Sequence, residues 1–312
     1  DKYLIVNPFF HTFGYKSGWL TCLLTGATAY PEPVFNASEI LKILAREQIT
    51  MLPGAPTIFQ SLLEQPSLDD TDLSHLRCAV TGAASVPEQL VRDMKNVLGF
   101  KQVYTGYGLT ECGVVSICRD GDDFDTIANT AGRAIDGIQV KVVDDNGGVV
   151  EPGDIGNIMV KGFNVMQGYF DDQQATKDTI DQQGWLDTGD IGWQDKNGYI
   201  KITDRAKDLF ICGGFNCYPA EIENLLFMHE QIVDVAVTGV KDDRLGEVAR
   251  AHIVVAAGKK LSHDELKSWC REHMANYKVP RSFSFLDELP KNASGKVQKF
   301  MLDSLTDGIN NA

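Results

Sequence analysis

The sequence predicts an α/β fold with a parallel-type sheet layer, then a small antiparallel β-barrel or sheet, then a small α+β domain at the C-terminal end. Three successive patterns predict this order. Strand-like and helical segments alternate up to about residue 116, short strands separated by turns follow from about 130, and a mixed module begins after 207.

Each pattern predicts particular elements. In the first, strands are expected at 3–6, 51–52, 78–81 and 102–105, and helices at 38–48, 56–63 and 87–98. Such alternation is typical of βαβ units, whose strands lie parallel. In the second, strands are expected at 139–143, 157–161 and 199–203; the first precedes a turn with Gly-Gly and the last follows an Asn-Gly turn. In the third, we expect helices at 219–228 and 262–273 and strands at 233–240 and 249–255.

Length and composition restrict the class of protein. The 312 residues suffice for about two domains, and 43% hydrophobic with 23% charged residues excludes a disordered or collagen-like chain. No apolar stretch approaches the roughly 20 residues that cross a bilayer, and no signal-peptide pattern is present. We therefore expect a cytoplasmic protein with no membrane span.

The net charge and the cysteines exclude further classes. The formal charge is −14, which argues against a nucleic-acid partner, so an anionic ligand must meet a local basic cluster. Residues 278–301 contain five basic and two acidic side chains and are predicted to supply this cluster. Seven scattered cysteines fit a reducing compartment, and Cys212 and Cys217 lack the further ligands of a zinc site.

A glycine-rich run, TGYGLTE at 105–111, follows a predicted strand. Gly106 and Gly108 would let the backbone approach a flat or phosphorylated ligand closely. Thr110 and Glu111 could then hold a phosphate oxygen and Mg²⁺. The alternative is a turn that only closes the strand.

Two further runs contain acidic side chains. WLDTGD at 185–190 places two short acids around a glycine, which suits hydrogen bonds with ribose hydroxyls, or else forms an Asx turn that caps a strand. DRAKD at 204–208 would ordinarily be a solvated corner, although Arg205 could bind a phosphate or ribose.

The last two runs lie in the C-terminal module. CGGFNCYPAEIE at 212–223 leads into a helix, and its glycines Gly213 and Gly214 could line a narrow channel or simply belong to a helix-entry loop. LPKNASGK at 289–296 places Lys296 on a flexible loop, for which the alternative is a solvated basic tail.

In this order and spacing, the runs resemble the adenylate-forming superfamily of acyl- and aryl-CoA synthetases, luciferases and peptide-synthetase adenylation domains. The resemblance covers essentially the whole chain. It implies a large AMP-binding domain at 1–204, made of an α/β sheet part (1–128) and a β-barrel part (129–204), and a small mobile domain at 205–312. It also implies Mg²⁺, ATP, CoA and a carboxylic acid as ligands.

The resemblance further implies roles for individual residues. The segment NPFFHTFG at 7–14 is similar to one beside the acyl pocket, which places His11 there with Gly82 and Gly106; on its residue type alone, His11 would be a core histidine. The stretch TGAA at 81–84 is similar to one that flanks the acyl chain and adenine. The implied nucleotide contacts are Gly82, Ala83, Ala84, Gly106, Tyr107 (stacked on adenine), Gly108, Asp190 (ribose) and Arg205 (ribose or phosphate). The other implied roles are Thr110 for phosphate, Glu111 for Mg²⁺, Lys296 as the catalytic lysine, Lys207 as the hinge, and Gly213 and Gly214 for the CoA channel.

The resemblance implies a reaction in two steps. The carboxylate attacks the α-phosphorus of ATP while Lys296 and Mg²⁺ on Glu111 neutralise charge, and acyl-AMP and pyrophosphate result. The small domain then turns about Lys207 and presents the glycine pair to pantetheine, so that the thiol displaces AMP. The Asn-x-Tyr-Pro pattern at 216–219 looks like the CoA-ligase form, and 9–15 and 105–111 are similar to bacterial ligases of fatty or ring-bearing acids, including steroid-degradation types.

Two alternatives stay open: an adenylation domain that loads a carrier protein or a luciferase-like oxidative enzyme, and a catalytically silent nucleotide-binding or interaction module. The superfamily's Ser/Thr/Gly-rich phosphate loop ending in Pro-Lys-Gly is absent. We therefore expect the chain to be the C-terminal portion of a longer enzyme. Because uncovered apolar surface would follow, self-association or partial disorder near residues 1–35 is expected.

Overall fold

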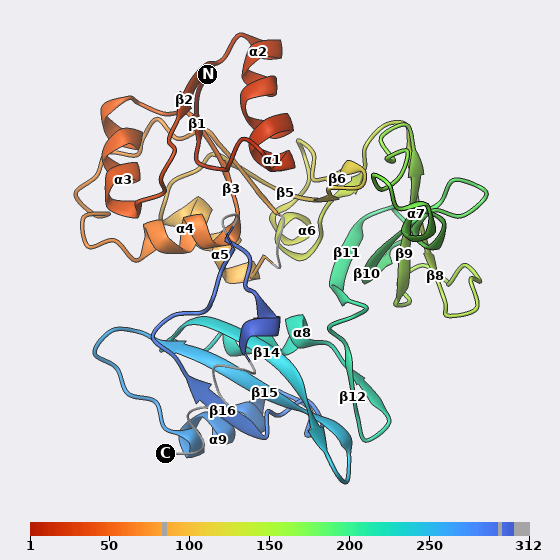
Figure 1. Ribbon diagram of the computed structural model, residues 1–312. Helices are drawn as coiled ribbons and strands as arrows, with labels where there is room; N and C mark the ends of the chain where they lie inside the picture. The colour runs from red at the N-terminus through yellow and green to blue at the C-terminus, as the bar shows by residue number, and fades with distance from the viewer. Residues whose placement is uncertain (83–85, 293–294, 303–312) are drawn as a thin grey trace. The chain divides into compact units, whose positions relative to one another are not determined.

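A computed structural model describes residues 1–82, 86–292 and 295–302 of the chain (Figure 1). The chain divides into two compact units, and each is described by itself. The first consists mainly of Asp1–Thr188 and Gly192–Ile202, and the second mainly of Gly189–Ile191, Thr203–Asn292 and the segment from Lys296. The domain boundary at 204 and the hinge at Lys207 remain predictions.

The first unit contains a seven-stranded sheet whose strand order is β2-β1-β3-β4-β5-β6-β7. Strands β1 to β5 pair in parallel, whereas the β5/β6 and β6/β7 pairs are antiparallel. This confirms the predicted parallel-type layer. The strands are β1 (Lys2–Ile5), β2 (Thr28–Pro31), β3 (Met51–Gly54), β4 (Cys78–Gly82), β5 (Gln102–Leu109), β6 (Gly113–Ile117) and β7 (Arg133–Ala134).

Helices cover both faces of this sheet. Because side chains alternate along a strand, Leu4 of β1 points into the main core and its neighbours Tyr3 and Ile5 point to the other face. The main core is formed with α3 (Ala37–Arg46), α4 (Pro56–Leu63), α5 (Glu88–Asn96) and α6 (Phe124–Asn129). The other face packs on Cys22 and Trp19, from the run of α1 (Thr12–Gly14), the π-helix η1 (Tyr15–Leu20) and α2 (Thr21–Thr25).

Local chemistry explains where these helices begin. Asn36 caps α3 by accepting a hydrogen bond from the backbone N–H of Glu39, and Pro56 occupies the first turn of α4, where its missing N–H costs nothing. Helix α5 begins at Glu88, one residue later than predicted, with Pro87 at the N-cap. Ser85, whose residue type suits a cap for this helix, lies outside the described residues.

A four-stranded sheet with the order β11-β10-β9-β8 lies mostly in the first unit. Its strands are β8 (Ile138–Val143), β9 (Gly156–Gly162), β10 (Leu186–Gln194) and β11 (Ile200–Arg205), with α7 (Gln173–Thr179) between β9 and β10. Strands β8 and β9 pair antiparallel, as predicted. Ile158, Leu186 and Ile200 share a core with Cys112 and Val115 of the β5–β6 region. This shared core fixes the β5–β6 connection against the small sheet.

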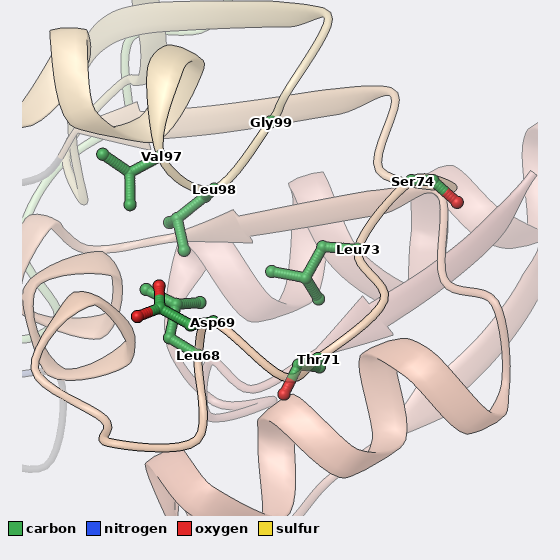
Figure 2. Close-up of a pocket in the computed structure, with 8 residues that line it drawn as sticks. All are labelled: Leu68, Asp69, Thr71, Leu73, Ser74, Val97, Leu98 and Gly99. Carbon is green, nitrogen blue, oxygen red and sulfur yellow. The ribbon is translucent and has the colours of Figure 1, made fainter.

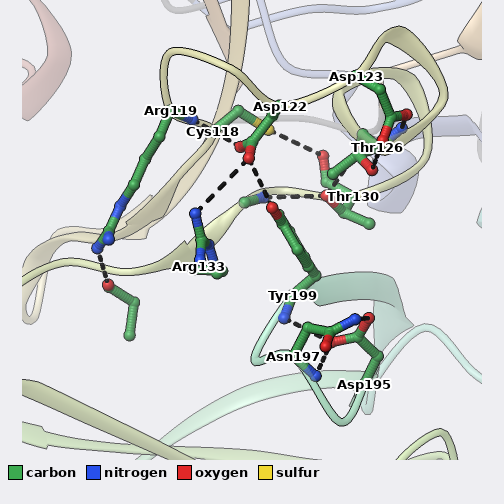
Figure 3. Close-up of polar contacts among 12 residues, drawn as sticks. Cys118, Arg119, Asp122, Asp123, Thr126, Thr130, Arg133, Asp195, Asn197 and Tyr199 are labelled. Carbon is green, nitrogen blue, oxygen red and sulfur yellow. Dashed lines mark hydrogen bonds and ion pairs between the residues drawn. The ribbon is translucent and has the colours of Figure 1, made fainter.

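A polar cluster ties the segment after β6 to the start of β11 (Figure 3). The hydroxyl of Tyr199 donates to Asp122 at 2.5 Å, and the Arg133 guanidinium lies 3.7 Å from the same carboxylate and 4.9 Å above the Tyr199 ring. Asp195 in turn accepts the backbone N–H of Tyr199 at 2.8 Å. The cluster links segments 77 residues apart in the sequence.

The second unit is the predicted small α+β module. Its sheet has the order β13-β12-β15-β14, and β16 pairs in parallel with β15. Phe210, Ile222, Val237 and Leu266 lie in its core. The elements are β12 (Phe210–Cys212), β13 (Phe215–Cys217), α8 (Pro219–Leu226), β14 (Ile232–Asp242), β15 (Gly246–Val255), α9 (His263–His273), β16 (Ser282–Phe285) and the 3₁₀-helix η2 (Lys299–Met301). In the part of the chain described, no helix combines the length and apolar character needed to span a membrane.

Candidate active site

Several predicted site residues follow the carboxyl ends of parallel strands. His11 lies beyond β1, Gly82 ends β4, and Gly106 pairs with Gly82 across β4 and β5. Because β1, β3, β4 and β5 are parallel, these ends share one edge of the sheet, where ligands bind in α/β proteins. Ala83 and Ala84 lie outside the described residues.

The glycines of this edge are required by close backbone packing. A Cβ on Gly82 would lie 2.3 Å from the carbonyl oxygen of Gly106, and one on Gly108 would lie 2.3 Å from that of Gly113. The prediction of a glycine-rich turn after the strand is wrong in part, because β5 continues to Leu109 and only residues 110–112 form the turn. Strand packing alone therefore explains these glycines, whether or not a ligand approaches them.

Thr81 adds a polar group to the same edge. Its hydroxyl oxygen is buried and has no hydrogen-bond partner among the residues that the structure describes. A buried hydroxyl without a partner costs about 1–3 kcal/mol. Thr81 is therefore a candidate contact for a ligand. The resemblance placed the stretch 81–84 beside the acyl chain and adenine but gave Thr81 itself no role.

Glu111 is held in place by the segment that follows β9. Its backbone oxygen accepts the N–H of Met166 at 2.7 Å, and its carboxylate accepts the hydroxyl of Tyr169 at 3.0 Å. Burial and the adjacent carboxylate of Glu111 raise the pKa of Tyr169. Thr110, beside Glu111, is exposed. The sequence did not reveal Tyr169, because this contact joins residues 58 positions apart.

The acidic groups of the structure fit a Mg²⁺ site completed by substrate phosphates better than one enclosed by protein side chains alone. The described residues contain no cluster of three or more His, Cys, Asp or Glu side chains that could enclose a metal ion. Mg²⁺ in nucleotide sites is commonly held by one or two carboxylates together with substrate phosphates and water. Glu111, on a hairpin loop beside Thr110, fits this second arrangement.

His11 caps a helix and is not a core histidine. It is the N-cap of α1, and its Nδ1 accepts the backbone N–H of Phe13 at 3.2 Å. The side chain is half-buried. Gly14 keeps the following turn close to the chain, because a Cβ there would lie 2.2 Å from the carbonyl oxygen of Pro8. The role of His11 at an acyl pocket remains a prediction.

The structure brings together two of the predicted nucleotide contacts, Asp190 and Arg205. The Nε of Arg205 lies 3.1 Å from the Oδ1 of Asp190, and the Asp190 side chain is only 4% exposed against 47% for Arg205. The run 185–190 does not form the Asx turn proposed as an alternative, since Leu186–Gln194 is strand β10. An exposed guanidinium beside a buried carboxylate leaves Arg205 accessible to a further anion.

Asp204 shows that the run 204–208 is not simply a solvated corner. Asp204 is 6% exposed and accepts the backbone N–H groups of Ala220 and Arg205, both at 2.7 Å. Burial raises the pKa of its carboxyl to about 6, although these hydrogen bonds and the charge of Lys299 oppose the shift. Lys207, three residues on, is exposed.

Gly213 and Gly214 form a two-residue hairpin between β12 and β13. Cys212 pairs with Phe215 across the turn, and the glycines have φ values of +58° and +88°. Two successive positive φ values are typical of a type I′ turn, which favours glycine. The turn thus accounts for the glycine pair, and its part in a CoA channel remains a prediction.

Lys296 lies on a loop whose ends pair with each other. Lys291 and Val297 form an antiparallel bridge, the N–H of Asn292 donates to the Lys296 oxygen at 2.9 Å, and the Lys296 N–H donates to Asn292 Oδ1 at 3.0 Å. The loop therefore presents Lys296 from a hairpin-like base.

Most of the basic side chains in the predicted cluster at 278–301 form ion pairs with acids of the same unit. Three of its five basic side chains are engaged within the unit: Lys278 with Glu221 at 2.5 Å, Lys291 with Asp234 at 2.7 Å and Lys299 with Glu223 at 2.7 Å. These charges are offset by acids that lie elsewhere in the sequence.

The first unit contains a pocket of about 330 Å³ (Figure 2). Its lining includes Leu68, Asp69 and Leu73, before β4, and Val97 and Leu98, before β5. It therefore opens at the amino ends of the strands, and no predicted site residue lines it.

Comparison with known proteins identifies the family. The family model described as "AMP-binding enzyme" matches residues 1–170, and the one described as "AMP-binding enzyme C-terminal domain" matches residues 221–296. The chain is 52% identical over 302 residues to 3-[(3aS,4S,7aS)-7a-methyl-1,5-dioxo-octahydro-1H-inden-4-yl]propanoyl:CoA ligase of Rhodococcus jostii, covering 97% of this chain and 57% of the relative. A protein of the same name from Mycobacterium tuberculosis is 50% identical, covering 98% and 58%.

A solved structure agrees with these relatives. The o-succinylbenzoate CoA synthetase of Bacillus subtilis, in complex with an acyl-adenylate intermediate, matches with a TM-score of 0.83 and 34% identity, over 97% of this chain and 60% of that one. The chain thus spans a little over half the length of the relatives it matches. The resemblance seen in the sequence is confirmed: the chain belongs to the AMP-binding enzyme family of the adenylate-forming superfamily.

Proposed function

We propose that this protein is an AMP-forming carboxylic acid–CoA ligase with ATP and CoA as co-substrates and Mg²⁺ as its metal. The observation that carries the proposal is the shared edge of the parallel sheet, where Gly82 and Gly106 meet and β5 leads directly into Thr110 and Glu111. Relatives of about 50% identity that carry the name CoA ligase support the same reaction.

In the proposed first step, the substrate carboxylate attacks the α-phosphorus of ATP, and pyrophosphate leaves. Tyr107 stacks on adenine, Asp190 and Arg205 bind the ribose and phosphate, and Lys296 donates to the phosphoryl oxygens as negative charge builds there. The hydrogen bond from Tyr169 holds the Glu111 carboxylate in a fixed orientation. Glu111 would hold Mg²⁺, which would supply further charge neutralisation on the phosphates.

In the proposed second step, the CoA thiol displaces AMP from the acyl-AMP. The second unit turns about Lys207, which withdraws Lys296 and presents the Gly213-Gly214 hairpin to pantetheine. Because no side chain projects from this turn, the pantetheine arm can pass close to the backbone. The protein accelerates the reaction by holding the thiol and the acyl-AMP in the right orientation, so no nucleophilic side chain is needed.

For the acid, we propose a ring-bearing carboxylic acid, with a fatty acid as the alternative. The name of the two relatives above describes a propanoyl group on a bicyclic dione. Their similarity extends over nearly all of this chain, including the His11 segment proposed to lie beside the acyl group.

An assay of the complete protein with ATP, Mg²⁺ and CoA tests the proposal. We expect AMP, pyrophosphate and an acyl-CoA when a bicyclic propanoate is supplied, and a lower kcat/KM with octanoate. Formation of ADP, or acyl transfer to a carrier protein and not to CoA, would contradict it. Binding of ATP and AMP in calorimetry with no turnover of any acid would instead support a silent nucleotide-binding module.

A cytoplasmic location and self-association are further proposals. Self-association is supported by apolar side chains that are exposed on α2, namely Leu23 and Leu24, and in the loop before α1, namely Phe10. Sedimentation of the protein over a range of concentrations tests self-association.

A further inference from the structure

Two ion pairs flank Lys296 in the second unit. Five residues before it, the Nζ of Lys291 lies 2.7 Å from the Oδ2 of Asp234. Three residues after it, the Nζ of Lys299 lies 2.7 Å from the Oε1 of Glu223. Both partners come from regions of the sequence more than 50 residues away.

Both acids are fixed by strand β14. Asp234 belongs to that strand, and Glu223, from α8, accepts the backbone N–H of Val237 in the same strand at 2.7 Å. The pair of Lys299 and Glu223 is the better shielded from water, with side chains 23% and 13% exposed, against 32% and 16% for Lys291 and Asp234. Both pairs are less exposed than the surface pair of Lys42 and Glu39, at 64% and 60%. Shielded pairs are costly to break, because the remaining charge loses its partner away from water.

Apolar contacts fasten the same segment. Leu289 and Leu302 are buried with Ala236 of β14, and Val297 packs against them. Between these points, the bridge of Lys291 with Val297 closes the base of the loop. The segment is thus attached to β14 on both sides of Lys296.

Lys299 remains charged in this setting. Burial lowers its pKa, but attraction by Glu223 and then by Asp204 and Asp208 outweighs that effect, and the net shift is upward. Lys299 therefore carries its positive charge at neutral pH.

We propose that these two ion pairs form a clamp that positions Lys296 for the adenylation step. Lys291, Asp234, Lys299 and Glu223 are positioning residues in this account. The proposal rests on the proposed function, in which Lys296 donates to phosphoryl oxygens. It adds that the base of the Lys296 loop must be rigid, since a displacement of about 1 Å can cost a large factor in rate.

The test separates the two half-reactions in the complete protein. Adenylation is followed by pyrophosphate release, and thioester formation by the reaction of supplied acyl-AMP with CoA. We expect Lys299→Met, Glu223→Gln and Asp234→Asn each to lower adenylation at least about tenfold and to leave thioester formation within about twofold. Lys299→Arg should recover most of the adenylation rate, because it keeps the charge.

A matched control exists in the same unit. Lys278 pairs with Glu221, which lies on α8 like Glu223, but neither residue forms an ion pair or hydrogen bond with the described residues of the segment 289–302. Lys278→Met should therefore leave adenylation within about twofold. A tenfold loss in this control as well would overturn the clamp, because any damage to the unit would then have the same effect.

The remaining outcomes distinguish the clamp from the proposed function. If Lys296→Ala lowers adenylation and the clamp variants do not, the clamp is wrong and the proposed function stands. If Lys296→Ala has no effect on adenylation, the role of Lys296 in the proposed function fails. If the clamp variants lower both half-reactions equally, the pairs are merely structural. If Glu223→Gln does not fold, Asp234→Asn is the deciding variant. It is the more easily tolerated change, because the pair of Lys291 and Asp234 is the more exposed of the two.

Discussion

Among single residues, Asp204 carries a charge that the fold makes costly. Its carboxylate is almost completely buried, and two backbone N–H groups satisfy only part of its hydrogen-bonding capacity. The charge of Lys299 favours the ionised form and that of Glu223 opposes it. Burial is the largest effect, so the pKa rises from 3.8 to about 6.

This shift predicts a dependence of stability on pH. Between the two pKa values, the folded state binds more protons at Asp204 than the unfolded state does, so the free energy of unfolding falls as the pH rises. The fall amounts to at most about 3 kcal/mol between pH 4 and pH 7. Asp204→Asn removes the titration. Thermal unfolding midpoints at several pH values should therefore decline less for the variant, and equal slopes would contradict the assignment.

How far single residues could be predicted depends on the range of their interactions. Glu111 and Lys296 stand out in short runs of the sequence, and their loop positions agree with those runs. The contact of Tyr169 with Glu111 and the partners of Lys291 and Lys299 could not be predicted, because each joins residues that only the folded chain brings together. The roles of the site residues in catalysis remain predictions.

At the scale of elements, the Tyr199 cluster joins the small antiparallel sheet to the segment after β6. The hydroxyl of Tyr199 donates to Asp122, whose carboxylate also faces Arg133. The aromatic ring lies beneath the Arg133 guanidinium. Loss of the hydroxyl alone would leave this ring contact in place.

Tyr199→Phe should therefore destabilise the first unit by about 1–2 kcal/mol, since it removes one hydrogen bond to a charged group. Hydrogen–deuterium exchange should become faster in residues 119–122 and 195–202 and stay unchanged in the second unit. Asn197→Ala, in the neighbouring turn, is the control, because it leaves Tyr199 and Asp122 intact. Equal exchange in the variant and the wild type would show that the cluster does not hold these segments.

The regular spacing of apolar residues predicted the helices and strands in which that spacing is unbroken. The helices near 38–48 and 56–63 and the strands β1, β3 and β4 were found with small errors at their ends, because apolar side chains recur at regular spacing there. Strand β2, which pairs in parallel with β1, was missed. Strand β10 was missed, since Asp187, Gly189 and Asp190 interrupt its pattern. The β12–β13 hairpin was also missed, because its strands have only three residues each.

At the scale of the whole molecule, the proposed reaction requires the second unit to take different positions in its two steps. The first unit contains the sheet edge with Gly82, Gly106 and Glu111, and the second contains Lys296 on a clamped loop. If the second unit changes position between the steps, Lys296 takes part in only one of them. The two half-reactions must then respond differently to its loss.

The most direct test is Lys296→Ala in the complete protein, with both half-reactions measured separately. The account predicts that adenylation, followed by pyrophosphate release, falls by about 10² or more, because a preorganised charge is lost from the transition state. It also predicts that the transfer of the acyl group from supplied acyl-AMP to CoA stays within about twofold of the wild-type rate. Equal losses in both half-reactions, or an unchanged adenylation rate, would contradict it.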